Sequence, residues 1–327
     1  MADFSTIKGF NVQTLSADPP APGVGQVWYN TTTGTMKGYG QVGTAAWSAG
    51  GAMPAGRYGS GMSGTQTAAI LYGGHPGDVN TTYLYNGASW TVSPATLGLG
   101  SHNMVSAGCG TQTAAQIAGG EFAAPPYYTN KTEQFNGTSW TDVATLNTPR
   151  GNMAAGGSQT AAITTFGNPG TGMATTESWN GSSWTEVTAA PYATYAGMGG
   201  GTQTSFIIAA GWAPPASSYN TSAYWDGSTW TATPNINTAR QYGSRGSSDG
   251  TSAVIFGGGA PPPWTTKTEN WDGSTWTELA DMSSPIKQNA GCGNALTAFS
   301  AGKEGPTGST ATEEWTTPTT TKTFTAS

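Results

Sequence analysis

The sequence predicts an all-β fold, and three features of its 327 residues lead to this prediction. Glycine (49 residues) and proline (20 residues) are abundant, and both favour turns. Charged residues make up only 9%, so Lys, Glu and Arg, which favour long helices, are scarce. Aromatic residues make up 11% and include 13 tryptophans, whereas a disordered polyelectrolyte shows the opposite composition.

An internal repeat of 43 to 50 residues indicates a propeller. Each copy carries an aromatic residue, Asn-Gly or Asp-Gly, two further residues and a Trp. Five complete copies occur, at 85–90, 135–140, 179–184, 225–230 and 271–276. Trp47 stands one period before the first copy, and Trp315 takes the first aromatic place of a sixth. This period is typical of a four-stranded propeller blade.

Each unit can be divided into four strands. Gly/Ala-rich segments such as 58–64, 103–110 and 152–157 are expected to be innermost, where only small side chains fit. An apolar strand ending in glycines follows, as at 68–74 and 252–258, and then a variable loop. The Asn-Gly or Asp-Gly pair predicts a hairpin with a type I′ turn. The Trp after it begins the outermost strand, and the two aromatics are expected to stack between neighbouring blades.

The last hairpin is incomplete, because Thr316, Thr317 and Pro318 follow Trp315 without a second Trp. We therefore expect the strand at Trp47 to complete the sixth blade, which pairs the N- and C-terminal strands and removes two exposed edges. The predicted organisation is an N-terminal arm (1–46), a six-bladed propeller (47–320) and a C-terminal tail (321–327). Within the arm, 26–29 and 35–39 predict a β-hairpin.

The repeats resemble kelch-like β-propellers. Paired glycines follow the second strand at Gly73-Gly74, Gly119-Gly120 and Gly257-Gly258, before the aromatic and the Trp. Other copies depart from the pattern, and the aromatic pair is closer than in the family. Segment 19–39 looks like a module of tailed-phage structural proteins, and the wording at 64–69 recurs at 110–115 and nearly at 201–205. Together these features are similar to kelch-like virion proteins of marine tailed phages of the cyanophage type.

This resemblance implies a non-enzymatic virion component, assembled in the host cytoplasm and present in multiple copies. A tail fibre or other appendage contributing to host attachment is expected; a capsid-decorating protein and a bacterial kelch adaptor are alternatives. Other virion proteins and a host-cell glycan are the expected partners, with no cofactor. The arm is expected to dock onto another virion subunit through Trp28, Tyr29 and Tyr39. Alternatively, its strand pair only packs on the propeller.

Two loops per blade are expected on one face: the loop entering the innermost strand and the variable loop. Aromatic residues beside Asn and Thr suit sugar rings, so these loops form a candidate glycan-binding surface. Alternatively, the aromatics pack against each other or against another subunit. The candidate residues are Phe122, Tyr127, Tyr128, Trp212, Tyr219 and Trp264.

Arginines form a second pattern on this face. Arg57, Arg150 and Arg240 each follow a repeat Trp by ten residues, in alternate blades. Three guanidinium groups around one mouth would bind an anion or carboxylate; alternatively, each braces its own blade. A fourth, Arg245, stands in an inner strand of small residues, where it would point into the channel.

Other chemistry has weak support. His75 and His102 show no metal-ligand spacing with Cys or carboxylates, and no phosphate loop or nucleophile motif appears. Residues 226–230 resemble the Asp-box of sialidases with one residue missing, which keeps a sialidase-like hydrolase as an alternative function. The net charge of −6 without basic clusters disfavours nucleic-acid binding. We expect no transmembrane segment and no secretory signal, and two small buried cysteines, Cys109 and Cys292.

Overall fold

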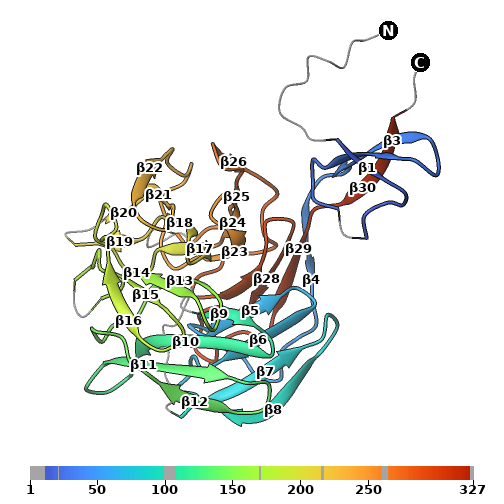
Figure 1. Ribbon diagram of the computed structural model, residues 1–327. Helices are drawn as coiled ribbons and strands as arrows, with labels where there is room; N and C mark the ends of the chain where they lie inside the picture. Colours follow the sequence, from blue (N-terminus) through green and yellow to red (C-terminus); the bar gives the residue numbers. More distant parts are fainter. Residues whose placement is uncertain are drawn as a thin grey trace. The chain divides into compact units, whose positions relative to one another are not determined.

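The computed structural model describes residues 12–20, 22–98, 108–168, 171–214, 217–259 and 264–324. Every regular element in these ranges is a β-strand, so the all-β prediction is confirmed (Figure 1). None of these residues forms a helix long and apolar enough to cross a membrane. The chain divides into a unit of residues 46–315 and a smaller unit of residues 1–45 with 316–327.

Six four-stranded sheets build the unit 46–315, and we number them one to six along the chain. In all six, the strands are arranged in chain order, except that sheet six takes its last strand from residues 46–49. In sheet four, a two-stranded ribbon is inserted in the chain between the second and third strands. Sheets one to three are β5 (Gly61–Thr65), β6 (Ala68–Tyr72), β7 (Thr81–Tyr85) and β8 (Trp90–Thr96); β9 (Gly108–Thr111), β10 (Ala114–Glu121), β11 (Tyr128–Phe135) and β12 (Trp140–Val143); and β13 (Ala154–Gly157), β14 (Ala162–Thr165), β15 (Thr176–Trp179) and β16 (Trp184–Val187).

Sheets four to six have the same order of strands. They are β17 (Met198–Thr202), β18 (Ser205–Ala209), β21 (Ser222–Trp225) and β22 (Trp230–Thr233); β23 (Ser244–Asp249), β24 (Ser252–Phe256), β25 (Thr268–Trp271) and β26 (Trp276–Glu278); and β27 (Ala290–Gly293), β28 (Thr297–Ala301), β29 (Thr312–Thr316) and β4 (Ala46–Ala49). A two-stranded ribbon, β19 (Trp212–Ala213) with β20 (Ser217–Ser218), projects from sheet four.

The first strands of the six sheets contact one another in the order β5, β9, β13, β17, β23 and β27, and β27 contacts β5. Around them the sheets radiate as in a propeller (Figure 1). The first strands lie so close together that small residues are required in them, as predicted. A Cβ on Gly108 would lie 2.0 Å from the Tyr72 hydroxyl, and one on Gly156 would lie 2.6 Å from the carbonyl oxygen of Gly201.

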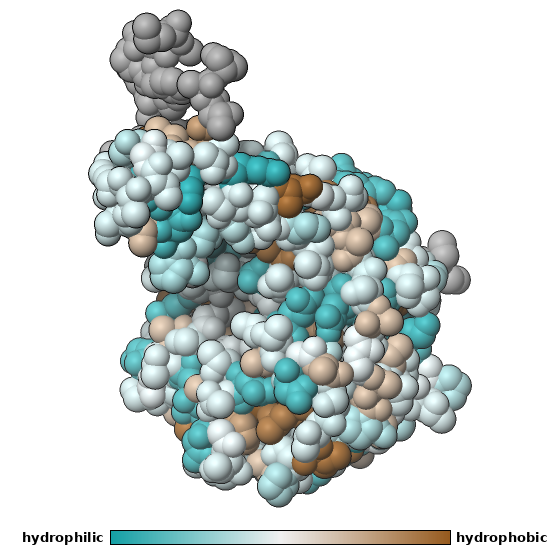
Figure 2. All heavy atoms as spheres, turned by 90° about the vertical axis from the view of Figure 1, so that its right-hand side faces the viewer, coloured by the Kyte–Doolittle hydropathy of each residue, from teal (hydrophilic) through white to brown (hydrophobic). Residues whose placement is uncertain are grey.

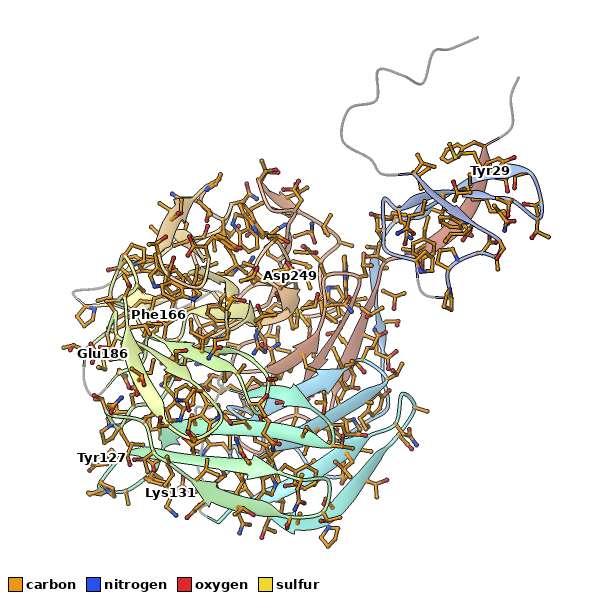
Figure 3. All side chains as sticks on the ribbon, viewed as in Figure 1. Tyr29, Tyr127, Lys131, Phe166, Glu186 and Asp249 are labelled. Carbon is orange, nitrogen blue, oxygen red and sulfur yellow. The ribbon has the colours of Figure 1, made fainter. Side chains whose placement is uncertain are left out.

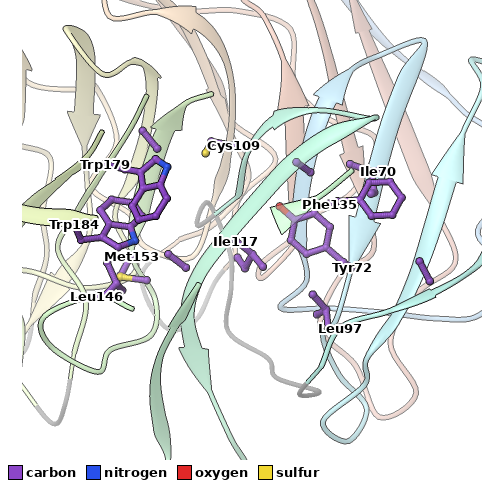
Figure 4. Packing of buried hydrophobic residues seen from close by; sticks show 14 residues of the cluster. Ile70, Tyr72, Leu97, Cys109, Ile117, Phe135, Leu146, Met153, Trp179 and Trp184 are labelled. Carbon is purple, nitrogen blue, oxygen red and sulfur yellow. The ribbon is translucent and has the colours of Figure 1, made fainter. Parts of the chain in front are cut away.

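The core lies between adjacent sheets and uses most of the aromatic residues. One cluster joins sheets one, two and three through Tyr72, Ile117, Phe135 and Trp179 (Figure 4). The two aromatics of each repeat pack as a tilted pair, with ring centroids 5.0 to 5.4 Å apart. Trp47 and Trp315 form the corresponding pair in sheet six, 5.5 Å apart, as expected if the two segments belong to one unit. On the face shown in Figure 2, hydrophobic residues occur singly or in small groups.

The tryptophan at the start of each outermost strand also reaches the preceding sheet. The indole N–H of Trp140 donates to the Thr82 hydroxyl, 2.9 Å away, and that of Trp184 donates to Thr132 at the same distance. In sheet six, Trp47 donates to Thr268 of sheet five at 2.8 Å. The outermost strands are therefore fixed to their neighbours by a directed hydrogen bond as well as by packing.

The recurring Gly-Thr-Gln-Thr motif has a structural role that was not predicted from the sequence. Gln112, in the turn between β9 and β10, donates to the carbonyls of Ala69 and Tyr85 in sheet one. The same bridge recurs wherever this glutamine is present. Gln66 bonds to Ala298 and Trp315, Gln159 to Ala115 and Phe135, and Gln203 to Ala162 and Trp179.

The predicted type I′ turn is wrong. Asn86 does not have a positive φ; only Gly87 does, with φ 90°. Four residues, 86–89, connect Tyr85 to Trp90, which pair across the strands. The Asn86 side chain accepts hydrogen bonds from the backbone N–H groups of residues 88 and 89, which stabilises the longer loop instead.

The smaller unit is one sheet, with strand order β1 (Gln13–Leu15), β2 (Val27–Asn30), β3 (Thr35–Gln41) and β30 (Thr319–Phe324). β2 and β3 form the predicted hairpin, and β1 joins parallel to β2. This arrangement differs from the expected boundaries, which ended the propeller at residue 320 and left 321–327 as a tail. Residues 319–324 pair with β3 over six positions, because a segment rich in β-branched threonine suits a strand better than a free tail.

Candidate functional site

The face that carries the entry loops also carries the variable loops, as predicted. In sheets one, three, four and five a residue of the entry loop pairs with a residue just after the second strand. These bridges are Tyr58–His75, Gly151–Asn168, Tyr195–Trp212 and Gln241–Gly259. Part of the entry loop of sheet two, including His102 and the start of the expected strand 103–110, lies outside the described residues, as do Pro261, Pro262 and Pro263.

A series of backbone hydrogen bonds, which we call the ring, joins the entry loops of sheets one, three, four, five and six at the channel entrance on this face. Gly59, Asn152, Ala196, Tyr242 and Gln288 each precede an innermost strand and have φ between 52° and 62°. Each sits twelve residues after a repeat Trp. The N–H of Ala196 donates to Asn152, that of Tyr242 to Ala196, that of Gln288 to Tyr242, and that of Gly59 to Gln288. Positive φ turns these amides toward the preceding sheet, so the ring links sheets three, four, five, six and one around the entrance.

Side chains of the ring and its neighbours form a polar aromatic group, which we call the mouth cluster: Glu121, Tyr128, Asn152, Tyr195, Trp212 and Tyr242. The Tyr195 ring meets the Trp212 ring edge-on at 5.0 Å and the Tyr242 ring at 6.5 Å. Asn152 donates from Nδ2 to the Glu121 carboxylate at 3.2 Å. All members except Asn152 are partly exposed.

The electrostatics of the mouth cluster keep its phenols protonated. Burial, then the Tyr128 phenol and the Glu121 carboxylate, raises the pKa of Tyr195. Burial, then the Tyr195 phenol, Glu121 and Tyr128, raises the pKa of Tyr242. Burial and Glu121 raise the pKa of Tyr128. The cluster therefore offers hydroxyl donors and aromatic faces beside a carboxylate acceptor and a buried amide whose Oδ1 has no hydrogen-bond partner.

The six aromatic candidates do not form one site. Tyr128 and Trp212 join the mouth cluster, whereas Tyr219 packs edge-on against Tyr192 at 6.0 Å. Tyr127 is 51% exposed and lies at the periphery of the unit (Figure 3), and the backbone of the half-buried Phe122 bonds to that of Tyr127. Tyr195 and Tyr242 were missed because they lie in entry loops. The available signal was that they stand eleven and twelve residues after a repeat Trp.

Trp264 lines a separate cavity of about 330 Å³ with Pro285, Lys287, Lys303 and Glu304. The Lys287 ammonium lies 4.0 Å from the centroid of the Trp264 ring and pairs with Glu304. One face of this indole is thus occupied by a cation of the chain itself.

The three arginines do not form a shared anion site, because each is buried within its own sheet. Arg150 pairs with Glu177 at 2.8 Å and Arg240 with Glu269 at 2.7 Å, and all four side chains have no exposed surface. Arg57 donates to the hydroxyls of Thr81 and Tyr83. The bracing interpretation of these residues fits their contacts.

Arg245 crosses the channel, as predicted, and bonds to four other sheets. Its guanidinium donates to the carbonyls of Gly199, Gly291, Gly108 and Ala155 at 2.6 to 3.0 Å. Cys109, Cys292 and glycines of the inner strands line the adjoining cavity of about 60 Å³. Both cysteines are free and buried, and burial raises the pKa of each thiol to about 12, so neither is a reactive thiolate.

In the smaller unit, Asp18 organises one face of the sheet. Its carboxylate accepts from the Trp28 indole at 3.0 Å, from Asn30 at 2.7 Å and from Lys37 at 2.7 Å. Trp28 is fully buried, so it belongs to the core of this unit and cannot contact a partner directly. Tyr39 is half-buried and bonds to Thr319, and Tyr29 is 39% exposed.

Comparison with known proteins supports the fold alone. No family model and no curated protein matches the chain. A solved structure titled "Structure of YjhT" is similar, with a TM-score of 0.68 and 13% sequence identity over 83% of this chain and 99% of that one. This likeness agrees with a propeller-like arrangement of the sheets.

Proposed function

We propose that this chain is a non-enzymatic structural protein of a phage particle, a tail fibre or appendage component whose mouth cluster binds a host-surface glycan. The observation that carries the glycan-binding part is the composition of the mouth cluster. It combines aromatic rings and protonated phenols with an amide and a carboxylate around one entrance. Sugar rings present apolar C–H faces and hydroxyls together, and such a surface meets both. The virion role rests on the resemblance of the repeats and of segment 19–39.

The scaffold of this proposal is a closed, six-bladed, kelch-like propeller. Three features support closure: the contact of β27 with β5, the place of β4 at the edge of sheet six, and the tilted pair of Trp47 and Trp315. A closed ring holds the entry loops at fixed positions around one axis. The mouth cluster is then preorganised, which lowers the entropic cost of binding.

Glycan binding is tested with the full chain on an array of bacterial surface saccharides. We expect wild-type binding to a subset of them and a loss of at least tenfold in affinity for Tyr242→Ala and Trp212→Ala. Val92→Ala is the matched control, because Val92 is 54% exposed but lies on the outermost strand of sheet one. Absence of binding across the array, or equal binding by all variants, would refute the glycan proposal.

Virion association is tested separately by labelling the chain and imaging purified particles. A regular signal at the tail is expected, whereas a signal distributed over the head would indicate a capsid-decorating protein. If the chain does not purify with particles, the virion role is wrong even when a glycan binds.

Docking of the smaller unit onto another virion subunit is part of this proposal. Tyr29 and Phe324 are 39% and 54% exposed, and Gly38 leaves room for the Phe324 ring, because a Cβ there would lie 2.9 Å from it. These apolar groups, rather than Trp28, are suited to contact a partner. We expect Tyr29→Ser/Phe324→Ser chains to fold but to be reduced at least fivefold in particles, while Gln41→Ser chains are incorporated normally.

A further inference from the structure

Sheets three and five contain the same buried guanidinium site. In sheet five, Arg240 pairs with Glu269 and donates from Nη1 to the Lys267 carbonyl at 2.8 Å. In sheet three, Arg150 pairs with Glu177 and donates to the carbonyl of Thr175 at 3.0 Å. A carboxylate and the carbonyl two residues before it thus form a repeated guanidinium acceptor.

The entry loops of these sheets also share a contact that fixes the carboxylate. The backbone N–H of Asn147 donates to Glu177 at 2.9 Å, and that of Asn237 donates to Glu269 at 2.7 Å. The arginine stands three residues after each asparagine. This contact gives a register by which the entry loop of any other sheet can be aligned.

Sheet six retains the acceptors but lacks the arginine. The N–H of Ser283 donates to Glu313 at 3.0 Å, in the same way as Asn147 and Asn237 do in their sheets. Three residues later the position of the arginine is occupied by Ile286. The carbonyl two residues before Glu313 is that of Ala311, and it accepts a hydrogen bond from Gly302, as the Lys267 carbonyl does from Gly257.

A pocket of about 190 Å³ lies at this place. Glu313, Ala311, Ile286, Ser284, Lys303 and Trp47 are among the residues that line it. Glu313 is half-buried, in contrast to the fully buried Glu177 and Glu269. Without a long arginine side chain in the loop, the carboxylate is thus accessible from outside.

We propose that this pocket binds a guanidinium group supplied from outside the chain, as the side chain of an arginine on another polypeptide. The planar fork of a guanidinium can engage a carboxylate and a carbonyl together, as Arg150 and Arg240 do, whereas an ammonium is a point donor. The Trp47 indole adds an aromatic surface that favours such a cation.

Lys303 opposes this binding and provides an internal test. Its ammonium lies 3.4 Å from the Ser284 hydroxyl, and the described residues show no ion pair between Lys303 and Glu313. Its positive charge in the pocket weakens the attraction for a second cation. Neutralising Lys303 should therefore strengthen binding.

The experiment uses the full chain and saturation-transfer NMR, which detects weak binding. The probes are N-acetyl-arginine amide, which represents a peptide side chain; methylguanidine, which represents the free group; and N-acetyl-citrulline amide, the uncharged isostere. We expect millimolar binding of the arginine probe, weaker binding of methylguanidine and at least tenfold weaker binding of citrulline. Methylguanidine that binds as well as the arginine probe would show that the pocket does not select a peptide-borne group, which would overturn the assigned ligand.

Variants give the decisive outcomes. Glu313→Gln should weaken binding at least tenfold, Lys303→Gln should strengthen it two- to fivefold, and Ile286→Arg should abolish it by filling the pocket from within. The exposed carboxylate of Glu186 provides the matched control, because Glu186→Gln should change nothing (Figure 3). Equal binding of citrulline, or unchanged binding by Glu313→Gln, would overturn the proposal even if Ile286→Arg failed to fold.

Discussion

Arg245 shows how one side chain can hold several sheets together. It is a buried cation that bonds to carbonyls rather than to a carboxylate. Burial lowers its pKa, but four carbonyl acceptors stabilise the charged form. The sequence indicated that the Arg245 side chain points into the channel, because a long side chain among small residues has no room between the inner strands. Its four partners could not be predicted, since they depend on how closely the inner strands approach.

Replacing Arg245 should strongly destabilise the unit 46–315. Arg245→Met removes all four hydrogen bonds and leaves their acceptors buried, so we expect a loss of about 4 kcal/mol in the free energy of unfolding. Urea unfolding followed by fluorescence measures this loss. Lys131→Met is a suitable control, because its ion pair with Asp142 is exposed and contributes little. An equal effect of the two substitutions would contradict the bracing role of Arg245.

Asp18 makes the smaller unit sensitive to acid. Its hydrogen bonds to Lys37, Asn30 and Trp28 lower its pKa from 3.8 to about 2. Because the folded pKa lies below the unfolded one, these interactions stabilise the sheet fully above the unfolded pKa and are lost as the pH falls toward the folded pKa. The protection of β2 and β3 from hydrogen exchange, measured relative to the intrinsic exchange rate at each pH, should therefore fall between about pH 4 and pH 2.

Asp18→Asn provides the comparison for this pH dependence. Its exchange in β2 and β3 should already be fast at neutral pH and should change less across the same acidic range. Asp142→Asn, in the other unit, should behave as wild type in these strands. A wild-type pH profile in Asp18→Asn would show that another group controls the response.

The strands were more predictable than the turns that join them. Gly/Ala-rich inner strands, apolar second strands and Trp-initiated outer strands follow from side-chain size and alternation. The Asn-Gly turn was mistaken because the side chain of Asn86 competes with the backbone for the N–H groups of a longer loop. The glutamine bridges were missed because a polar residue in a repeated turn resembles an ordinary surface residue until the neighbouring sheet is placed.

The glutamine bridges should be measurable contributors to stability. Gln112→Ala leaves the carbonyls of Ala69 and Tyr85 without this donor, and we expect a loss of about 1–3 kcal/mol. The exposed Thr113 of the same turn is the matched control, and Thr113→Ala should change the free energy of unfolding by less than about 0.5 kcal/mol. Similar urea midpoints for Gln112→Ala and wild type would argue against the bridge.

Sheet six differs from the other five sheets of unit 46–315, because only there does the outermost strand come from the far end of the sequence. Trp47→Ala should weaken this seam, whereas Trp140→Ala removes an equivalent indole from a sheet that is continuous in the chain. We expect faster hydrogen exchange in β27–β29 and β5 for Trp47→Ala. For Trp140→Ala the increase should stay near β7 and β11, and identical exchange patterns in both variants would contradict a seam at sheet six.

The candidate site was predictable as a face but not as a set of residues. Turn-rich variable loops located Tyr128 and Trp212, and the repeat period placed both kinds of loop together. The arginines looked like a shared anion site because sequence spacing gives their angular positions but not their depth. Burial beside Glu177 and Glu269 became visible only with the third strands in place.

Three of the four glutamine bridges run from a later sheet to the one before it in the chain. The acceptors of Gln112, Gln159 and Gln203 all lie earlier in the chain and are therefore translated first. Gln66 is the exception, since its acceptors at Ala298 and Trp315 emerge more than 200 residues later. Because synthesis runs from the N-terminus, sheets two to four can form their glutamine bridges as soon as they are translated, whereas the bridge of sheet one forms only after sheet six is translated. A chain released before residue 315 is translated would leave the Gln66 amide without these acceptors. We therefore expect full resistance to proteolysis only when translation is nearly complete.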